Sequence, residues 1–189
     1  LWLVPALPAA SPQQDSGLGR LREEARREGW QRVPEILVAV GADPGARIAD
    51  VGSGDGFFTV RLARAVGRTG RVTAVDLSAQ ALDRLRRRLT DEGISNVDVL
   101  QGDAADTDLP AESLDAILIV NAYHEMERYQ QTLVRLRSAL KPGGRLVLVE
   151  PFDSKLRREP RDRQTRAHSL SAGFAVGEVR SSGFDVVAL

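Results

Sequence analysis

The stretch Ile48-Ala49-Asp50-Val51-Gly52-Ser53-Gly54-Asp55-Gly56-Phe57 decides the fold. A short apolar run ends in an acid, a loop with glycine at every second position follows, and a helical pattern then begins with Phe58 and Leu62. Glycine lets the backbone turn sharply and lets a ligand approach without a Cβ in the way. A strand, a Gly-rich turn and a helix N-terminus together form a nucleotide-type cofactor site at the carboxyl end of a parallel sheet.

Apolar runs and helical patterns alternate along the rest of the chain. Strands are predicted at 47–51, 71–76, 97–101, 114–121, 145–150 and 185–189, and helices over most of 18–40, at 57–66, 78–92 and 129–140, and ending over 177–182. The continuous apolar run 117–120 is typical of a strand buried on both faces. This alternation predicts an α/β fold, in which βαβ units with right-handed crossovers build a Rossmann-like, doubly wound, mostly parallel sheet.

Size and composition fit one domain of this kind. The chain has 189 residues, of which 42% are hydrophobic, and its 26 Lys and Arg balance its 26 Asp and Glu. A balanced charge argues against a mainly electrostatic nucleic-acid binder, so no nucleic acid is expected as a partner. Cysteine is absent and there are only two histidines, which excludes disulfides, thiolate chemistry and a histidine-rich metal site, and no metal site is predicted.

The N-terminal segment differs from the rest. Residues 1–10 are apolar and end in small residues, like the tail of a signal peptide, but no basic region precedes them. We expect residues 1–19 to be a flexible or signal-like segment and residues 20–189 to be a single domain. No stretch is long enough to span a bilayer, so stable membrane insertion is not expected.

Asp76 ends the second predicted strand about twenty residues beyond the Gly-rich loop. An acid at this place can accept hydrogen bonds from the two ribose hydroxyls of a nucleotide cofactor. The same residue also precedes Leu77 and Ser78, which open a helix, so taken alone it would be read as a helix cap. Together with the Gly-rich loop it favours ribose binding.

The spacing of the glycines narrows the cofactor. Dinucleotide folds carry G-x-G-x-x-G, whereas this loop reads Gly52-x-Gly54-x-Gly56 with Asp50 before it and Asp55 inside it. Two carboxylates are poorly placed beside a pyrophosphate and well placed beside a cation. A cofactor with an ammonium and a sulfonium meets that requirement.

Over about residues 30–189, the chain resembles the class I S-adenosylmethionine (SAM)-dependent methyltransferases. Five motifs in order carry the resemblance. They are D-V-G-S-G-D-G at Asp50–Gly56, V-D-L-S at Val75–Ser78, Q-G-D-A at Gln101–Ala104, L-D-A-I-L-I-V-N-A-Y-H-E at Leu114–Glu125 and L-K-P-G-G-R-L-V-L-V-E-P at Leu140–Pro151. Tyr123-His124-Glu125 and the K-P-G-G turn are similar to those of bacterial small-molecule and quinone-type methyltransferases.

The resemblance implies SAM as cofactor and assigns roles to the matching residues. The methionine end of SAM would be held by Asp50 and the backbone of Gly52, Ser53 and Gly54. Asp76 would bind the ribose, Leu77 would pack on the adenine, Asp103 and the backbone N–H of Ala104 would bind the adenine edge, and the carbonyl of Asn121 would lie near the SAM ammonium.

The residues after the fourth predicted strand are candidates for catalysis. His124 has an imidazole that can take a proton from a hydroxyl or amine nucleophile, and Tyr123 can shape the acceptor pocket. Either side chain can instead be structural. Glu125 is expected to orient His124 or merely to begin a helix. His168 is too far along the chain to be placed, but it can meet the substrate if the basic segment 153–166 folds over the site.

We therefore expect a methyltransferase that acts on a small-molecule acceptor by in-line displacement, in the cytoplasm because SAM is made there. The alternatives are an NAD(P)-dependent Rossmann oxidoreductase and a SAM-binding module without catalysis. The sheet of the family usually has seven strands, and we expect the seventh to be missing from this protein or to have been lost from the sequence. The strand edge left uncovered in this way can pair with another chain, which makes a homo-oligomer possible.

Overall fold

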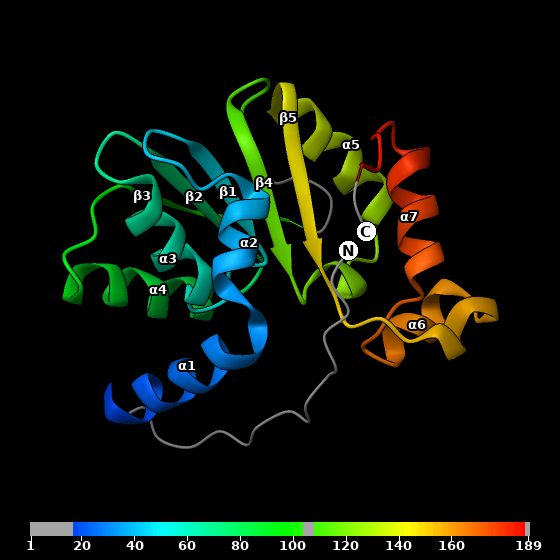
Figure 1. The fold of residues 1–189 in the computed structure, drawn as a ribbon, viewed down its shortest axis with the longest axis horizontal. Coiled ribbons are helices and arrows are strands. Elements are labelled where there is room, and N and C mark those ends of the chain that lie inside the picture. The colour runs from blue at the N-terminus through cyan, green and yellow to red at the C-terminus, as the bar shows by residue number, and fades with distance from the viewer. Residues whose placement is uncertain (1–16, 104–107, 188–189) are drawn as a thin grey trace.

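The computed structural model describes residues 17–103 and 108–187. Its strands are β1 (Arg47–Val51), β2 (Arg71–Asp76), β3 (Val97–Gln101), β4 (Leu114–Val120) and β5 (Leu140–Val149). Its helices are α1 (Gly17–Gln31), α2 (Val33–Val40), α3 (Phe57–Val66), α4 (Ala79–Asp91), α5 (Tyr129–Ala139), α6 (Arg161–Arg166) and α7 (Ala172–Ser181), with the short 3-10 turns η1 (Tyr123–Glu125) and η2 (Ser154–Arg158). The five strands form one parallel sheet in the order β3-β2-β1-β4-β5 (Figure 1).

Alternate residues of each strand point to opposite faces, and each face is covered by helices. Ile48 of β1 belongs to an apolar cluster with residues of α2 and α3, whereas the next residue, Ala49, packs in a cluster with residues of α5 and α7. In β4, Leu118 belongs to the first cluster, and Ile117 and Ile119 belong to the second. The result is the three-layer αβα arrangement that the continuous apolar run of β4 predicted.

The predicted α/β fold with a parallel sheet is confirmed, and most boundaries agree within a residue. β1, β2, β3 and α3 lie where the sequence placed them. α2 contains Pro34 in its first turn, and Arg32 between α1 and α2 has a left-handed backbone (φ 48°), so the helical region 18–40 breaks where the proline predicted. α1 begins at Gly17, inside the segment 1–19 that was expected to be flexible, and residues 1–16 lie outside the described residues.

Two predictions about the C-terminal half of the chain need correction. β5 begins at Leu140 rather than Arg145, because the register shifts between Leu114 and Ala116, so that residues 141–144 are accommodated as an irregularity opposite Asp115. The predicted sixth strand, 185–189, does not form over residues 185–187, and residues 188–189 are not described. Residues 185–187 line a groove beside β5 without pairing with it. A strand requires a ladder of backbone hydrogen bonds to a neighbouring strand, and residues 185–187 lack one, so this segment is irregular.

All five strands run in the same direction, so their carboxyl ends meet at one edge of the sheet. The Gly-rich loop follows β1, Asp76 ends β2, η1 follows β4 and Glu150 follows β5. The candidate site is therefore assembled along this edge from segments that are far apart in the sequence. Among the described residues, no helix combines the length and the apolar character that crossing a membrane requires.

Candidate functional site

The Gly-rich loop is fastened to the end of β2. Gly52 N and Ser53 N donate to the carbonyl oxygen of Val75 at 2.8 and 3.1 Å, and Gly54 N donates to Oδ2 of Asp76 at 2.8 Å. The sequence predicted that the loop and Asp76 act at one site, and the structure joins them by a direct hydrogen bond. The loop after β1 and the end of β2 are thus held as one surface.

Two glycines show how closely this loop is packed. Gly52 has φ 76°, and a Cβ added there would lie 2.4 Å from Cβ of Ala122 at the end of β4. Gly54 has φ 55°, and a Cβ added there would meet nothing within 4 Å. Only glycine adopts such backbone conformations freely, so both positions favour glycine. The loop packs tightly against Ala122 at Gly52 and leaves open space at Gly54.

Asp50 lies beneath the loop as a buried acid. It is 3% exposed, and its Oδ2 accepts a hydrogen bond of 2.6 Å from Oγ1 of Thr59 in α3. Burial raises the pKa of Asp50 to about 6, with the nearby charge of Asp76 acting in the same direction, whereas the Thr59 hydrogen bond and the charge of Arg27 lower it. A buried carboxyl with a raised pKa gains stability from a cation brought beside it.

Ser53 contributes a buried polar atom that has no hydrogen-bond partner within the described part of the chain. Its side-chain oxygen is fully buried, and among the described residues nothing donates to it or accepts from it. Buried hydroxyls are normally hydrogen-bonded. An unsatisfied hydroxyl in the loop therefore fits a site whose remaining partner is a ligand with polar groups, such as the amino-acid end of SAM.

Asp76 accepts hydrogen bonds from two backbone N–H groups and keeps the acceptor capacity that the predicted ribose contact needs. Its Oδ2 holds Gly54 N, and its Oδ1 accepts from Ser78 N at 2.8 Å, while Ser78 itself caps α4 through Ala81 N. Each carboxylate oxygen has a second lone pair, so these bonds leave acceptor capacity for ribose hydroxyls. The next residue, Leu77, is 60% exposed, and this unburied apolar side chain fits the predicted adenine contact.

Two further predicted cofactor residues, Asp103 and Asn121, follow strands at the same edge. Asp103 is exposed just after β3, and Ala104 falls outside the described residues. Asn121 follows β4 with a left-handed backbone (φ 53°), and its N–H donates to the carbonyl oxygen of Val149 at 2.8 Å. The positions of Asp103 and Asn121 agree with the proposed SAM contacts, which remain a prediction for both residues and for Ala104.

His124 is oriented by Glu150 and not by its neighbour Glu125. The Glu150 carboxylate is buried, and its Oε2 lies 2.6 Å from His124 Nδ1. Its Oε1 accepts from the backbone N–H groups of Ala122 and Tyr123 at 2.9 and 2.7 Å. One carboxylate therefore holds the start of the η1 turn and the ring of His124, and it directs Nε2 of His124 away from itself.

Tyr123 lies in the core. Its side chain is fully buried, and its hydroxyl donates to Oε2 of Glu178 in α7 at 2.7 Å. Burial, together with this hydrogen bond and the charge of Glu178, raises the pKa of Tyr123 well above its usual value. Tyr129 packs edge-on against the ring at 6.2 Å. This geometry favours the structural alternative for Tyr123 over contact with an acceptor.

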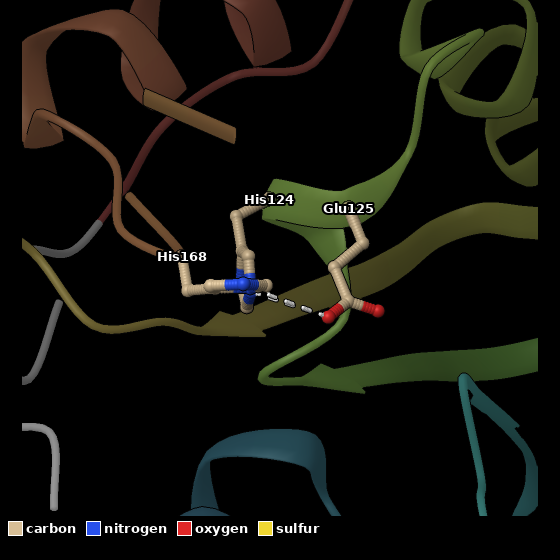
Figure 2. A group of neighbouring side chains, drawn as sticks. All are labelled: His124, Glu125 and His168. Carbon is tan, nitrogen blue, oxygen red and sulfur yellow. Dashed lines mark ion pairs between the residues drawn. The ribbon is translucent and has the colours of Figure 1, made fainter. Parts of the chain in front are cut away.

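His168, which the sequence did not place, lies beside His124, and its predicted contact with the substrate stays a prediction. The two rings are 5.8 Å apart and nearly perpendicular, at 87°. Figure 2 shows both imidazoles and the Glu125 carboxylate converging at the end of β4. The two histidines of the chain thus belong to one cluster.

The comparisons with known proteins agree with this geometry. A family model described as a methyltransferase domain matches residues 48–144, which is half of the chain and includes the Gly-rich loop, Asp76 and η1. The chain belongs to the class I SAM-dependent methyltransferases. The resemblance that the five motifs predicted is confirmed, and no comparison supports the oxidoreductase alternative.

Two relatives of this methyltransferase are both named ubiquinone/menaquinone biosynthesis C-methyltransferase UbiE. The one from Shewanella pealeana is 32% identical over 122 residues, covering 64% of this chain and 48% of the relative. The one from Vibrio parahaemolyticus is 34% identical over 151 residues, covering 79% and 57%. The chain thus spans about half the length of the curated relatives it matches.

A solved structure supports the fold of this methyltransferase. The crystal structure of a SAM-dependent methyltransferase from Aquifex aeolicus superposes with a TM-score of 0.76 at 22% identity, and it covers 93% of this chain and 92% of that one. At this level of identity the likeness establishes the shared fold.

Sequence reasoning missed the residues that hold η1 from outside its own segment. Arg161 of α6 donates to the carbonyl oxygens of His124 and Tyr123, each at 2.9 Å, and Oγ1 of Thr165 donates to the His124 carbonyl oxygen at 2.9 Å. Arg161 also pairs with Glu178 at 3.1 Å. The basic residues of segment 153–166 indicated that it could lie near the site, but the sequence did not distinguish the inward-facing Arg161 from its exposed neighbours.

Proposed function

We propose that this chain binds SAM at the carboxyl edge of its sheet and transfers the methyl group to a small-molecule acceptor by in-line displacement. The observation that carries the proposal is the joined loop: Gly52, Ser53 and Gly54 are hydrogen-bonded to the end of β2 above the buried Asp50. Asp50 and the unpaired Ser53 hydroxyl would face the methionine end, and Asp76 would face the ribose.

The chemistry asks little of the protein beyond alignment. SAM supplies a sulfonium leaving group, so the residues of the chain mainly position the acceptor and exclude water. A base is needed only when the nucleophile must lose a proton. His124 is the candidate, because Glu150 occupies Nδ1 and leaves Nε2 directed toward the exposed cluster with Glu125 and His168.

The acceptor is proposed to be a small molecule. Because two relatives are named ubiquinone/menaquinone biosynthesis C-methyltransferase, intermediates of quinone biosynthesis, methylated at carbon, are the first acceptors to test. The charge balance of 26 basic and 26 acidic residues gives no reason to expect a nucleic acid. We place the activity in the cytoplasm, where SAM is made.

Calorimetry with SAM, S-adenosylhomocysteine and NAD tests the cofactor. We expect SAM and its demethylated product to bind and NAD not to bind. Asp76→Ala should weaken SAM binding by about 1–3 kcal/mol through lost charge-assisted hydrogen bonds, whereas Asp83→Ala, which removes an exposed carboxylate on α4 that pairs with Arg86, should leave it unchanged. Binding of NAD without SAM would overturn the proposal.

Methyl transfer is then tested with labelled SAM and a metabolite extract, followed by mass identification of the product. His124→Ala should lower turnover more than SAM affinity, because the imidazole is proposed to act on the acceptor and not on the cofactor. Equal turnover in the two proteins would leave His124 a structural residue. SAM binding without transfer to any acceptor would instead favour a binding module.

A further inference from the structure

The cluster at the end of β4 has the composition of a metal site. His124, Glu125 and His168 each offer one ligand atom, and the three atoms lie within 4.8 Å of one another. Nε2 of His124 and Nδ1 of His168 are each 3.7 Å from Oε1 of Glu125. Figure 2 shows the three side chains meeting at this point.

These distances are close to what a bound ion requires. Two ligands on a tetrahedral Zn²⁺ with bonds of about 2.0–2.1 Å are about 3.3 Å apart. Each 3.7 Å separation from Glu125 Oε1 therefore closes with side-chain movements of a few tenths of an ångström, and the two imidazole nitrogens lie within 4.8 Å of each other. Glu125 and His168 are 63% and 75% exposed at their side chains, so both can move without disturbing the core, and water can reach the remaining coordination positions.

His124 also has the environment of a metal ligand. A ligating histidine usually donates its second ring N–H to a carboxylate, which fixes the ring and leaves the other nitrogen for the ion. The buried Glu150 provides this bond to Nδ1 at 2.6 Å, and Nε2 faces Glu125. The buried, oriented imidazole of His124 distinguishes this cluster from the groups of exposed acidic side chains that are common on protein surfaces.

The second histidine is brought to the first by structure that does not depend on an ion. Arg161 and Thr165 of α6 both bind the His124 carbonyl oxygen, and the chain then turns at His168, whose N–H donates to the Thr165 carbonyl oxygen at 3.0 Å. The hydrogen bonds between α6 and η1 thus bring the backbone of His168 close to His124 without an ion, and the exposed His168 side chain only has to adjust.

We propose that His124, Glu125 and His168 form a site for a divalent transition-metal ion of the Zn²⁺ type, with open positions toward solvent. Two imidazoles and one carboxylate suit zinc and related ions, whereas Mg²⁺ prefers oxygen ligands. This differs from the expectation that two histidines are too few for a metal site. An ion on Nε2 would occupy the lone pair that a base needs, so metal binding and the base role of His124 exclude one another in a single molecule.

Zn²⁺ titration of the tag-free full chain by calorimetry tests the site, and it does so independently of methyl transfer. We expect one Zn²⁺ per chain and no comparable binding of Mg²⁺. Glu125→Gln and His168→Asn should each weaken Zn²⁺ binding at least about ten-fold, with unchanged circular dichroism because both side chains are exposed. Asparagine is chosen because His168 has φ 48°, a left-handed conformation that asparagine tolerates.

Glu127→Gln is the matched control, since it changes an exposed glutamate two residues away that is outside the cluster. Selective ¹⁵N labelling of histidine gives a second readout, because the chain contains only two: Zn²⁺ should shift Nε2 of one and Nδ1 of the other together. Absence of saturable Zn²⁺ binding, equal binding of Mg²⁺, or unchanged affinity in either Glu125→Gln or His168→Asn would overturn the proposal.

Discussion

Replacing Asp50 with asparagine should stabilise the cofactor-free protein above pH 7. Burial raises the pKa of Asp50 from 3.8 to about 6, so the folded state holds a charged carboxylate at neutral pH against an environment that favours the neutral form. A shift of about two units corresponds to about 3 kcal/mol. Asparagine keeps an oxygen that can accept the Thr59 hydrogen bond, so the gain should approach this figure as an upper bound.

The pH dependence identifies the cause. Because the folded pKa lies above the unfolded value of 3.8, protonation of Asp50 stabilises the native protein at low pH, and this contribution is lost as the pH rises through about 6. The advantage of Asp50→Asn should therefore shrink by about 1.4 kcal/mol between pH 8 and pH 5, and continue to shrink toward pH 4.

Urea unfolding of both proteins at pH 8, 6 and 5 measures this difference, in which the titration of distant groups cancels. Calorimetry should show that the variant binds SAM more weakly than the original protein, since the variant lacks the negative charge proposed to attract the ammonium. A difference in unfolding free energy that is absent at pH 8, or that does not change with pH, would refute the reasoning about Asp50.

Two other substitutions test the edge of the sheet. Glu150→Gln should place an amide N–H₂ against Nδ1 of His124 and move the ring proton to Nε2, which histidine ¹⁵N shifts would report; an unchanged tautomer would show that Glu150 does not control the ring. Gly52→Ala should lower the unfolding free energy by at least about 1–3 kcal/mol, because it adds backbone strain and a clash with the β4 end. Gly54→Ala adds only the strain, so urea unfolding should show a smaller loss, and equal losses would count against the clash.

Local sequence signals were enough to predict the first half of the sheet. β1 and β2 are bounded by glycines and polar residues and need no distant partner to be recognised. The same signals misled at residues 141–144, where Lys-Pro-Gly-Gly is typical of a turn but is accommodated within β5 as a bulge opposite Asp115. Whether these residues form a turn or a bulge depends on the register between β4 and β5, which cannot be predicted from the periodicity of the sequence.

Some residues of the candidate site could likewise be predicted from local sequence, whereas others depend on contacts between distant segments. The Gly-rich loop and Asp76 were predictable because each follows a strand whose carboxyl end must lie at the common edge. Glu150 was read only as part of a motif, because its contact with His124 depends on β4 and β5 being neighbours. His168 could not be placed, since its position depends on how α6 packs against η1 through Arg161.

Arg161 also determines where this chain tolerates variation. Of the six basic residues between positions 155 and 166, it alone faces inward and anchors the turn that carries His124, whereas the other five are exposed. Those five can be exchanged in combinatorial libraries with little risk to folding. The excursion that leaves at Phe152 and returns at Leu170, where the two residues form a bridge, is therefore a suitable segment in which to alter acceptor preference by directed evolution.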